Sequence, residues 1–387
     1  MEYAVAAMRD VSFGVFDHVD RGNQPLGALY EERFRLVEAI DAAGFRTYHV
    51  AEHHATPLGM AASPGVYLAA VAQRTRRLRF GPLVYILPLY HPLRLIEEIC
   101  MLDHLSGGRF ELGVGRGISP YELAYWNVPF LEAAAMCQEA LEVILSGLRG
   151  GRLTYEGHYY RFTNVPMEFT PVQRPHPPLW QGVVSPASAA TAARRSVNVV
   201  SNAPCATVKT LVDAYFDARS QDEVRRHDEV QSHDGVQSHD HRSQATHGTG
   251  GHSAPIQCNG TPPFVGMQRH VVVADRDADA LDSAREAYRR WYESLTQLWR
   301  QFGTVPMSFA DSLEGAIQRD AAIVGSPETV RKEVERQLTV TGANYFVGRF
   351  LFGTLPLERA LRSIELFSRE VMPGLPSRPS APSARPA

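Results

Sequence analysis

Short segments rich in β-branched and aromatic residues alternate with longer segments of helical periodicity along most of this chain. In the first pair, a strand-like run is followed by Leu29, Phe34 and Ile40 at helical spacing within Leu26–Ala43. The predicted strands are Ser12–Phe16, Arg46–Ala51, Leu78–Tyr85, Gly108–Val114, Leu179–Val184, Asn198–Ser201, Gln268–Ala274 and Asn344–Leu351. Strands that alternate with helices form a parallel sheet, and eight such units predict closure into a (β/α)₈ barrel.

The turn after the first predicted strand argues against the main alternative, an open doubly wound sheet. Such sheets usually carry a glycine-rich turn at that point, whereas this chain reads FDHVDRG. A barrel commonly takes about 250 residues, and more with insertions, so 387 residues fit one domain. We therefore predict an α/β protein with a single TIM-barrel domain over residues 1–375. A Pro/Ser/Ala-rich tail at 376–387 is expected to be disordered.

A polar, histidine-rich stretch interrupts the second half of this pattern. Residues Gln221–Pro263 contain the related repeats HDEVQS and HDGVQS and few apolar side chains, so we predict a disordered insertion. Because it lies between a helix and the next strand, it should emerge opposite the catalytic face of the barrel. A second segment outside the pattern, Arg152–Pro178, is typical of a hairpin followed by a proline-rich connection.

Charge, hydropathy and cysteine content narrow the class of protein. The formal charge of −3 gives no general attraction to nucleic acid or to an anionic membrane. No apolar run approaches the roughly 20 residues that span a bilayer, and the N-terminus lacks the pattern of a secretory signal. The four cysteines are scattered without a C-x-x-C pair, so reduced thiols and a cytoplasmic location are expected.

One cationic and two hydroxyl side chains follow the fourth and fifth predicted strands. Arg116 lies in a Gly-Arg-Gly loop with Gly117, and Ser185 and Ser188 stand at the start of a predicted helix. The arginine offers a fork of donors, and the helix start offers free N–H groups and a favourable dipole. Together they predict a phosphate-binding site, although the two serines taken alone also fit plain helix caps.

Glu52, His53 and His54 follow the second predicted strand. A histidine at the end of a barrel strand is placed for proton transfer to a ligand bound at that end. The three residues also fit a buried polar pair or a metal site. A catalytic zinc needs a third ligand at recognisable spacing, and the sequence offers none, so we predict no metal.

Three longer stretches resemble the bacterial luciferase family. They are AGFRTYHVAEHH at residues 43–54, the run from ILPLYHPL to GVGRG at residues 86–117, and a closing stretch from GSPETVRKEV to SREVMP. The resemblance implies a TIM barrel that binds reduced flavin and activates O₂ as a flavin C4a-peroxide. It further implies that the enzyme oxygenates a small organic substrate.

The resemblance also assigns a cofactor site. The phosphate-binding arginine of the family falls on Arg116, next to Gly117 and the backbone of Ile118. The phosphate-binding hydroxyls fall on Ser185 and Ser188. These five residues are therefore the expected flavin phosphate site.

The catalytic residues come from the same resemblance. The active-site histidine of the family falls on His53, and Glu52 and His54 are then supporting residues. Family members often carry a non-proline cis peptide bond at the end of the third strand, which here is Leu83–Val84. Gly115 stands where the light-emitting subunit has a cysteine, so bioluminescence itself is not expected.

The resemblance favours FMN, bound as FMNH₂ and supplied by a separate flavin reductase, since the chain has no nicotinamide-binding fingerprint. A deazaflavin (F420)-dependent hydride-transfer enzyme on the same barrel is the alternative, because fold does not fix function. A non-catalytic barrel subunit is a third hypothesis, which the retained Arg116 and His53 disfavour. A homodimer is expected by analogy, and the organic substrate is not predicted.

Overall fold

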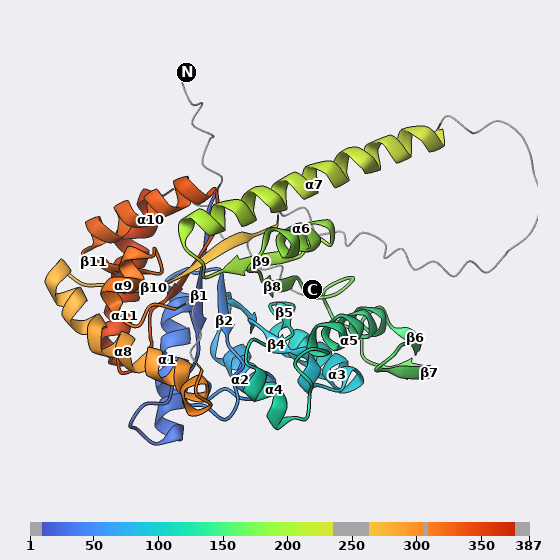
Figure 1. Cartoon of the computed structure of the whole chain (residues 1–387), viewed down its shortest axis with the longest axis horizontal. Helices are drawn as coiled ribbons and strands as arrows, with labels where there is room; N and C mark the ends of the chain where they lie inside the picture. Colours follow the sequence, from blue (N-terminus) through green and yellow to red (C-terminus); the bar gives the residue numbers. More distant parts are fainter. Residues whose placement is uncertain (1–9, 235–262, 305–308, 376–387) are drawn as a thin grey trace, which may run out of the picture.

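The computed structural model describes residues 10–234, 263–304 and 309–375. Its main sheet is a strongly curved parallel β-sheet surrounded by helices (Figure 1). The strands are β1 (Ser12–Asp17), β2 (Thr47–Val50), β3 (Arg79–Pro82), β4 (Tyr85–Ile86), β5 (Leu112–Gly115), β8 (Leu179–Gly182), β9 (Asn198–Ser201), β10 (Val265–Val273), β11 (Ala322–Gly325) and β12 (Tyr345–Arg349). Their order is β3-β2-β1-β12-β10-β9-β8-β5-β4, with β11 paired to β10.

The two ends of this order meet, which closes the barrel. Strands β3 and β4 are consecutive parts of one segment, interrupted at Leu83–Val84. β4 pairs with β5, and a parallel bridge joins Phe80 to Phe110. The first strand lies between β2 and the last strand, with Ser12 opposite Tyr345 in β12. The predicted (β/α)₈ TIM barrel is confirmed.

Helices cover the outside of the barrel, and several begin at a proline that follows a short polar residue. Prolines occupy the first turn of α2, α3, α4, α6 and α10, where the missing N–H costs nothing. The helices are α1 (Leu26–Ala42), α2 (Pro64–Arg74), α3 (Pro92–Ser106), α4 (Pro120–Tyr125), α5 (Ala133–Gly147), α6 (Pro186–Arg194), α7 (Cys205–Asp234), α8 (Asp277–Gln301), α9 (Leu313–Gln318), α10 (Pro327–Thr341) and α11 (Leu357–Leu366). None of the described helices is long and apolar enough to cross a membrane.

Two smaller features complete the described chain. The predicted hairpin is present as β6 (Gly151–Glu156) and β7 (Arg161–Met167), which pair antiparallel at the edge of the molecule (Figure 1). Single turns of 3₁₀ or π-helix lie at Leu87–Leu89, Phe367–Val371 and Met372–Gly374.

The prediction of disorder was wrong for the first part of the insertion, Gln221–Asp234. Helix α7 continues to Asp234, and Figure 1 shows it projecting well past the strands. Ion pairs one helical turn apart, Arg219 with Glu223 and Arg225 with Asp222, support this extension. Low apolar content therefore did not exclude a helix here. Residues 235–262 of the insertion and the tail at 376–387 lie outside the described residues.

The sequence also missed one strand. β11 pairs with His270–Val273, the second half of the long strand β10, and is followed by α10. The sequence analysis predicted no strand between α8 and α10. The run AIVG at Ala322–Gly325 is too short to distinguish from the apolar turns around it.

Aromatic side chains fill the barrel interior. Trp180 is fully buried there, with its ring centroid 5.9 Å from that of Phe264 and 5.0 Å from that of Tyr345. The indole Nε1 of Trp180 donates to Glu111, which directly precedes β5 and so lies at the N-terminal side of these rings. Glu111 also accepts from Arg46 at 2.8 Å, so one buried carboxylate connects three strands and their turns.

Candidate active site

The residues predicted to carry chemistry all follow the C-terminal ends of parallel strands and therefore share one end of the barrel. Glu52–His54 follow β2, Arg116–Ile118 follow β5, and Ser185 and Ser188 follow β8. Since β5 pairs with both β4 and β8, the arginine loop has Leu83–Val84 on one side and the two serines on the other. Their positions in the sequence, directly after predicted strands, therefore predicted that these residues share one end of the barrel.

His53 is held by a buried carboxylate that the sequence analysis did not single out. Its Nδ1 lies 3.1 Å from Oε1 of Glu122, and the side chain of Glu122 is 3% exposed. The second carboxylate oxygen of Glu122 accepts the backbone N–H of His54 at 3.2 Å. Glu122 therefore fixes both the ring of His53 and the backbone that follows it.

Helix α4 brings Glu122 to this position. Ser119 caps the helix by accepting the N–H of Glu122, which is the third helical residue. A glutamate at this position normally returns to the capping residue in a capping box. Here the carboxylate contacts His53 instead. The signal in the sequence was the pattern Ser-Pro-Tyr-Glu. That pattern indicates an ordinary helix start, so it did not reveal the contact with His53.

Glu52 and His54 form a second pair. Nε2 of His54 lies 2.8 Å from Oε1 of Glu52, while Oε2 of Glu52 accepts the backbone N–H of Ile86 at 2.9 Å. The glutamate thus connects the end of β2 to β4. The ring of His54 packs 4.3 Å from that of Trp126, between centroids. Both side chains are therefore fixed by neighbouring groups.

On the other side of His53 lies a set of aromatic and basic side chains that sequence reasoning missed. The ring of His18, which follows β1, is 5.4 Å from the ring of His53. Nδ1 of His18 accepts the indole N–H of Trp291 from α8 at 3.1 Å. Arg349 and His270, from β12 and β10, are buried beneath Trp291. No motif marks these residues, since they come from four segments far apart in the chain.

The electrostatic environment shifts the pKa values of these histidines in opposite directions. Burial lowers the pKa of His53, but the charge and hydrogen bond of Glu122 outweigh it, so the net pKa is raised. Burial and the charge of Arg349 lower the pKa of His18 and of His270 well below the ordinary value. His53 is therefore the histidine of this group that favours a proton, and its neighbours are neutral bases.

Arg116 projects from the end of β5 and is exposed. Its guanidinium lies 4.9 Å from the centroid of the Phe130 ring, and within the described ranges no carboxylate forms an ion pair with it. Ile118, two residues on, is 59% exposed, and Val184 at the end of β8 is 80% exposed. A free cation beside uncovered apolar side chains is an arrangement that suits a ligand with an anionic tail and an apolar body.

Ser185 and Ser188 cap helix α6 in the manner that the sequence left open. Ser185 Oγ accepts the N–H of Ser188, and Ser188 Oγ accepts the N–H of Ser185 at 3.2 Å. The hydroxyl of Ser188 donates to the carbonyl of Ser185 at 2.7 Å. A phosphate bound here would take the place of these local bonds at a helix start.

The peptide bond between Leu83 and Val84 is cis, as predicted. It lies against the arginine loop, because a Cβ atom at Gly115 would come within 2.6 Å of Cγ2 of Val84. The glycine at 115 thus follows from the bulk of Val84, and the cysteine of the light-emitting subunit would not fit here without movement.

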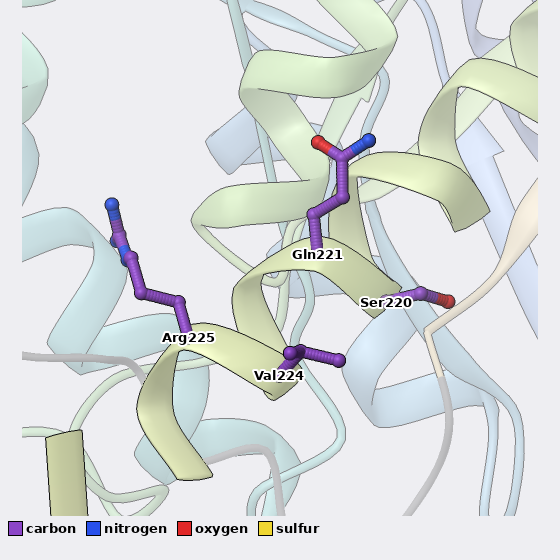
Figure 2. A pocket seen from close by; sticks show the side chains of 4 residues that line it. All are labelled: Ser220, Gln221, Val224 and Arg225. Carbon is purple, nitrogen blue, oxygen red and sulfur yellow. The ribbon is translucent and has the colours of Figure 1, made fainter. Parts of the chain in front are cut away.

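A hollow elsewhere on the molecule does not belong to this site. It is lined by Ser220, Gln221, Val224 and Arg225 of α7 (Figure 2). Helix α7 begins at Cys205, just after β9, and fifteen residues of helix rise about 22 Å, so this hollow lies beyond the opposite end of the barrel. In the part of the chain that the structure describes, no group of three or more His, Cys, Asp or Glu side chains is placed to hold a metal.

Comparison with known proteins connects this geometry to a family. Residues 11–345 match the family model described as luciferase-like monooxygenase. The chain is 38% identical to the uncharacterized protein y4wF of Sinorhizobium fredii, over 94% of this chain and 96% of the relative. It is 28% identical to 4-hydroxyprotoasukamycin monooxygenase of Streptomyces nodosus subsp. asukaensis, over 95% and 92%. A shorter match, 30% identical over 48% and 53%, is to the oxygenase component of a flavin-dependent trigonelline monooxygenase of Acinetobacter baylyi.

Solved structures share the barrel. The oxygenating constituent of 3,6-diketocamphane monooxygenase from Pseudomonas putida, in complex with FMN, superposes with a TM-score of 0.73 at 20% identity, covering 95% of this chain and 100% of that one. The coenzyme F420-dependent tetrahydromethanopterin reductase from Methanopyrus kandleri superposes with a TM-score of 0.65 at 18% identity, covering 95% and 99%. At these identities the likeness establishes the fold, and both flavin and deazaflavin proteins share it.

Proposed function

We propose, from the premise that this chain belongs to the luciferase-like monooxygenase family, that it is the oxygenase component of a two-component system. It would take FMNH₂ from a separate flavin reductase and use O₂ to oxygenate a small organic substrate. The observation that carries the proposal is the buried His53–Glu122 pair, which lies at the same barrel mouth as the free, exposed Arg116. Two relatives named as oxygenating components support the division of labour.

The residues present fit a flavin. Arg116 would hold the phosphate together with the start of α6 at Ser185 and Ser188, with Gly117 and the Ile118 backbone beside them. An aromatic ring system needs apolar cover, and the exposed side chains of Ile118 and Val184 offer it. Bound as FMNH₂, the flavin supplies the electrons that reduce O₂. Leu83 and Val84, which lie against the arginine loop, would help to hold the flavin.

His53 would hold and deliver the proton that oxygen chemistry consumes. Glu122 accepts the Nδ1 proton of His53, which leaves Nε2 as the atom that exchanges a proton with the ligand. The hydrogen bonds of Glu52 to His54 and to the Ile86 backbone keep this segment in place. The low exposure of His53, 8%, limits the access of bulk water to that proton.

Arg116→Ala is expected to weaken FMNH₂ binding by about 1.5–3 kcal/mol, the usual loss for a charge-assisted hydrogen bond. His53→Ala should leave this affinity nearly unchanged, because His53 lies away from the phosphate site. Anaerobic titration of both variants and the wild type would measure the dissociation constants. Equal affinity for the wild type and Arg116→Ala would remove Arg116 from the phosphate site.

The cofactor itself is tested by anaerobic titration of the purified protein with FMNH₂, F420 and F420H₂, followed by air. Tight binding of FMNH₂ and consumption of O₂ on mixing would support the oxygenase. Binding of the deazaflavin alone would move the proposal to hydride transfer. Binding of none of them would favour a non-catalytic barrel subunit.

We further propose a homodimer that pairs through α2 and α3. These helices pack side by side and carry large apolar side chains that are half or more exposed, namely Val66, Met101 and Leu105. Light scattering should give about twice the chain mass of 42.9 kDa for the wild type. Met101→Glu places a charge in the interface and should give the monomer mass. A monomeric wild type would refute the proposal.

A further inference from the structure

The mouth of the barrel contains a buried cation that the proposed chemistry does not use. Arg349 is the last residue of β12, and Tyr345 and Val347 on the same strand point into the barrel interior. Because side chains alternate along a strand, Arg349 points inward as well, at the mouth end of that interior. It is 4% exposed.

Aromatic rings and one histidine surround its guanidinium. The central carbon lies 5.0 Å from the centroid of the Phe16 ring and 4.8 Å from that of Trp291. Nη1 lies 2.7 Å from Nε2 of His270. Nε has no hydrogen-bond partner, and Nη2 makes no hydrogen bond within the described residues. The Nε–Nη2 edge of the guanidinium is therefore free.

Two carboxylates, Asp17 and Asp20, lie close enough to act on Arg349 through their charge. Asp17 accepts the hydroxyl of Tyr48 at 2.9 Å and lies 3.6 Å from Nε of Arg33. One oxygen of Asp20 accepts the backbone N–H of Gly353 at 2.6 Å, and the other, Oδ1, is buried without a hydrogen-bond partner. Neither lies within ion-pair distance of Arg349, and no other described carboxylate does. Both act on it only through longer-range charge.

A buried cation without a counter-ion is costly, because it has lost its hydration and gained no equivalent partner. Departures of this kind are characteristic of functional sites. The free Nε–Nη2 edge offers two parallel N–H donors at the spacing of the two oxygens of a carboxylate. The rings of Phe16 and Trp291, whose centroids lie 5.0 and 4.8 Å from the central carbon, add apolar surface around the guanidinium.

We propose that Arg349 binds the carboxylate of an organic-acid substrate through its Nε–Nη2 edge, with the apolar part of that acid against Phe16 and Trp291. This inference rests on the proposed oxygenase function and names the substrate class of the same site. His18 lies between Trp291 and His53, so the acid would be held one side chain away from the catalytic histidine. Trp291 comes from α8, outside the barrel, and must shift to admit the acid.

The experiment compares acids with their uncharged amides. Benzoate, phenylacetate and hexanoate, each with the corresponding amide, are titrated against the full-length protein by calorimetry. At least one acid should bind about ten- to a hundredfold more tightly than its amide, as expected for one charge-assisted pair. Arg349→Met should abolish that preference, and Arg349→Lys should restore part of it. Wild type that binds no acid more tightly than its amide, or a preference that survives in Arg349→Met, would overturn the proposal.

Thermal unfolding separates a ligand-binding role from a structural one. Arg349→Met removes a buried charge that no carboxylate contacts, which should offset the lost hydrogen bond to His270, so its melting temperature should equal or exceed that of the wild type. Arg269 is the matched control: it is also deeply buried, but its Nε, the atom that is free in Arg349, donates to Gln337 at 2.7 Å. Arg269→Met should lower the melting temperature and leave the acid preference intact. A lower melting temperature for Arg349→Met would indicate that Arg349 is structural and would count against the subsite.

Failure of this inference differs from failure of the proposed function. FMNH₂ affinity is measured on the same preparations. A wild type that binds FMNH₂ but shows no acid preference overturns only the subsite. Absence of FMNH₂ binding with an intact acid preference overturns only the choice of cofactor.

Discussion

Glu111→Ala is expected to lower the free energy of unfolding by about 3–5 kcal/mol, which is the usual cost of removing one partner from a buried ion pair. The variant leaves Arg46 and Arg79 without the carboxylate that both contact, and it leaves the indole N–H of Trp180 unpaired. Chemical denaturation monitored by circular dichroism would measure the change. Glu111→Gln keeps one hydrogen-bonding oxygen and gains one hydrogen-bonding nitrogen, so it should lower the free energy of unfolding by less. A loss below 1 kcal/mol for Glu111→Ala would show that this carboxylate does not hold the strands together.

The same residue predicts a dependence of stability on pH. Burial raises the pKa of Glu111, but the charges of Arg46 and Arg79 outweigh it and lower the pKa to about 2. The unfolded chain titrates this group near 4.3. Because the folded pKa is the lower one, its contribution is complete above about pH 4.5 and is lost as the pH falls toward 2. The Glu111→Gln variant should therefore show a flatter stability profile over this window than the wild type does.

His53→Ala is expected to reduce kcat by about 10²–10⁴-fold, the range for loss of a positioned general acid or base. Single-turnover experiments with prebound FMNH₂ and O₂ would measure it, so that flavin binding does not enter the rate. His49 is the control: it is buried inside the barrel and bonded to Tyr345 at 2.9 Å. His49→Gln should change stability more than kcat. A kcat for His53→Ala within threefold of the wild type would exclude His53 from proton transfer.

Glu122→Gln tests how His53 is tuned. The glutamate raises the pKa of His53 against the effect of burial, so the amide should lower it. In the pH–rate profile, the limb that requires protonated His53 should then move to lower pH. An unchanged profile with reduced kcat would mean that Glu122 only positions the ring.

Much of the fold was predictable because it rests on local periodicity. The alternation of strands and helices indicated the barrel, and the turn after β1 excluded the open sheet. The missed strand β11 is four residues long, and its role depends on the long strand β10 that it pairs with. The extension of α7 was missed because polar helices lack the apolar stripe on which the prediction relied.

The site was predictable only where it follows strand ends in the sequence. Glu52, His53 and Arg116 are contiguous with strong strand signals. Glu122 reaches His53 from 69 residues away, and its local pattern is that of an ordinary helix start. Arg349 and Trp291 meet through tertiary packing of β12 and α8, which no local pattern encodes.

The pairing of β1 with β12 has a consequence for how the protein is made. Ser12 and Tyr345 are neighbours in the sheet, although more than three hundred residues separate them along the chain. The barrel therefore cannot close during translation until Tyr345–Arg349 has left the ribosome. Until then one edge of β1 stays unpaired, which is a state prone to association with other chains. Such a long-range closure also makes folding slow. Chaperones should therefore affect the yield of folded protein more than the stability of the folded state.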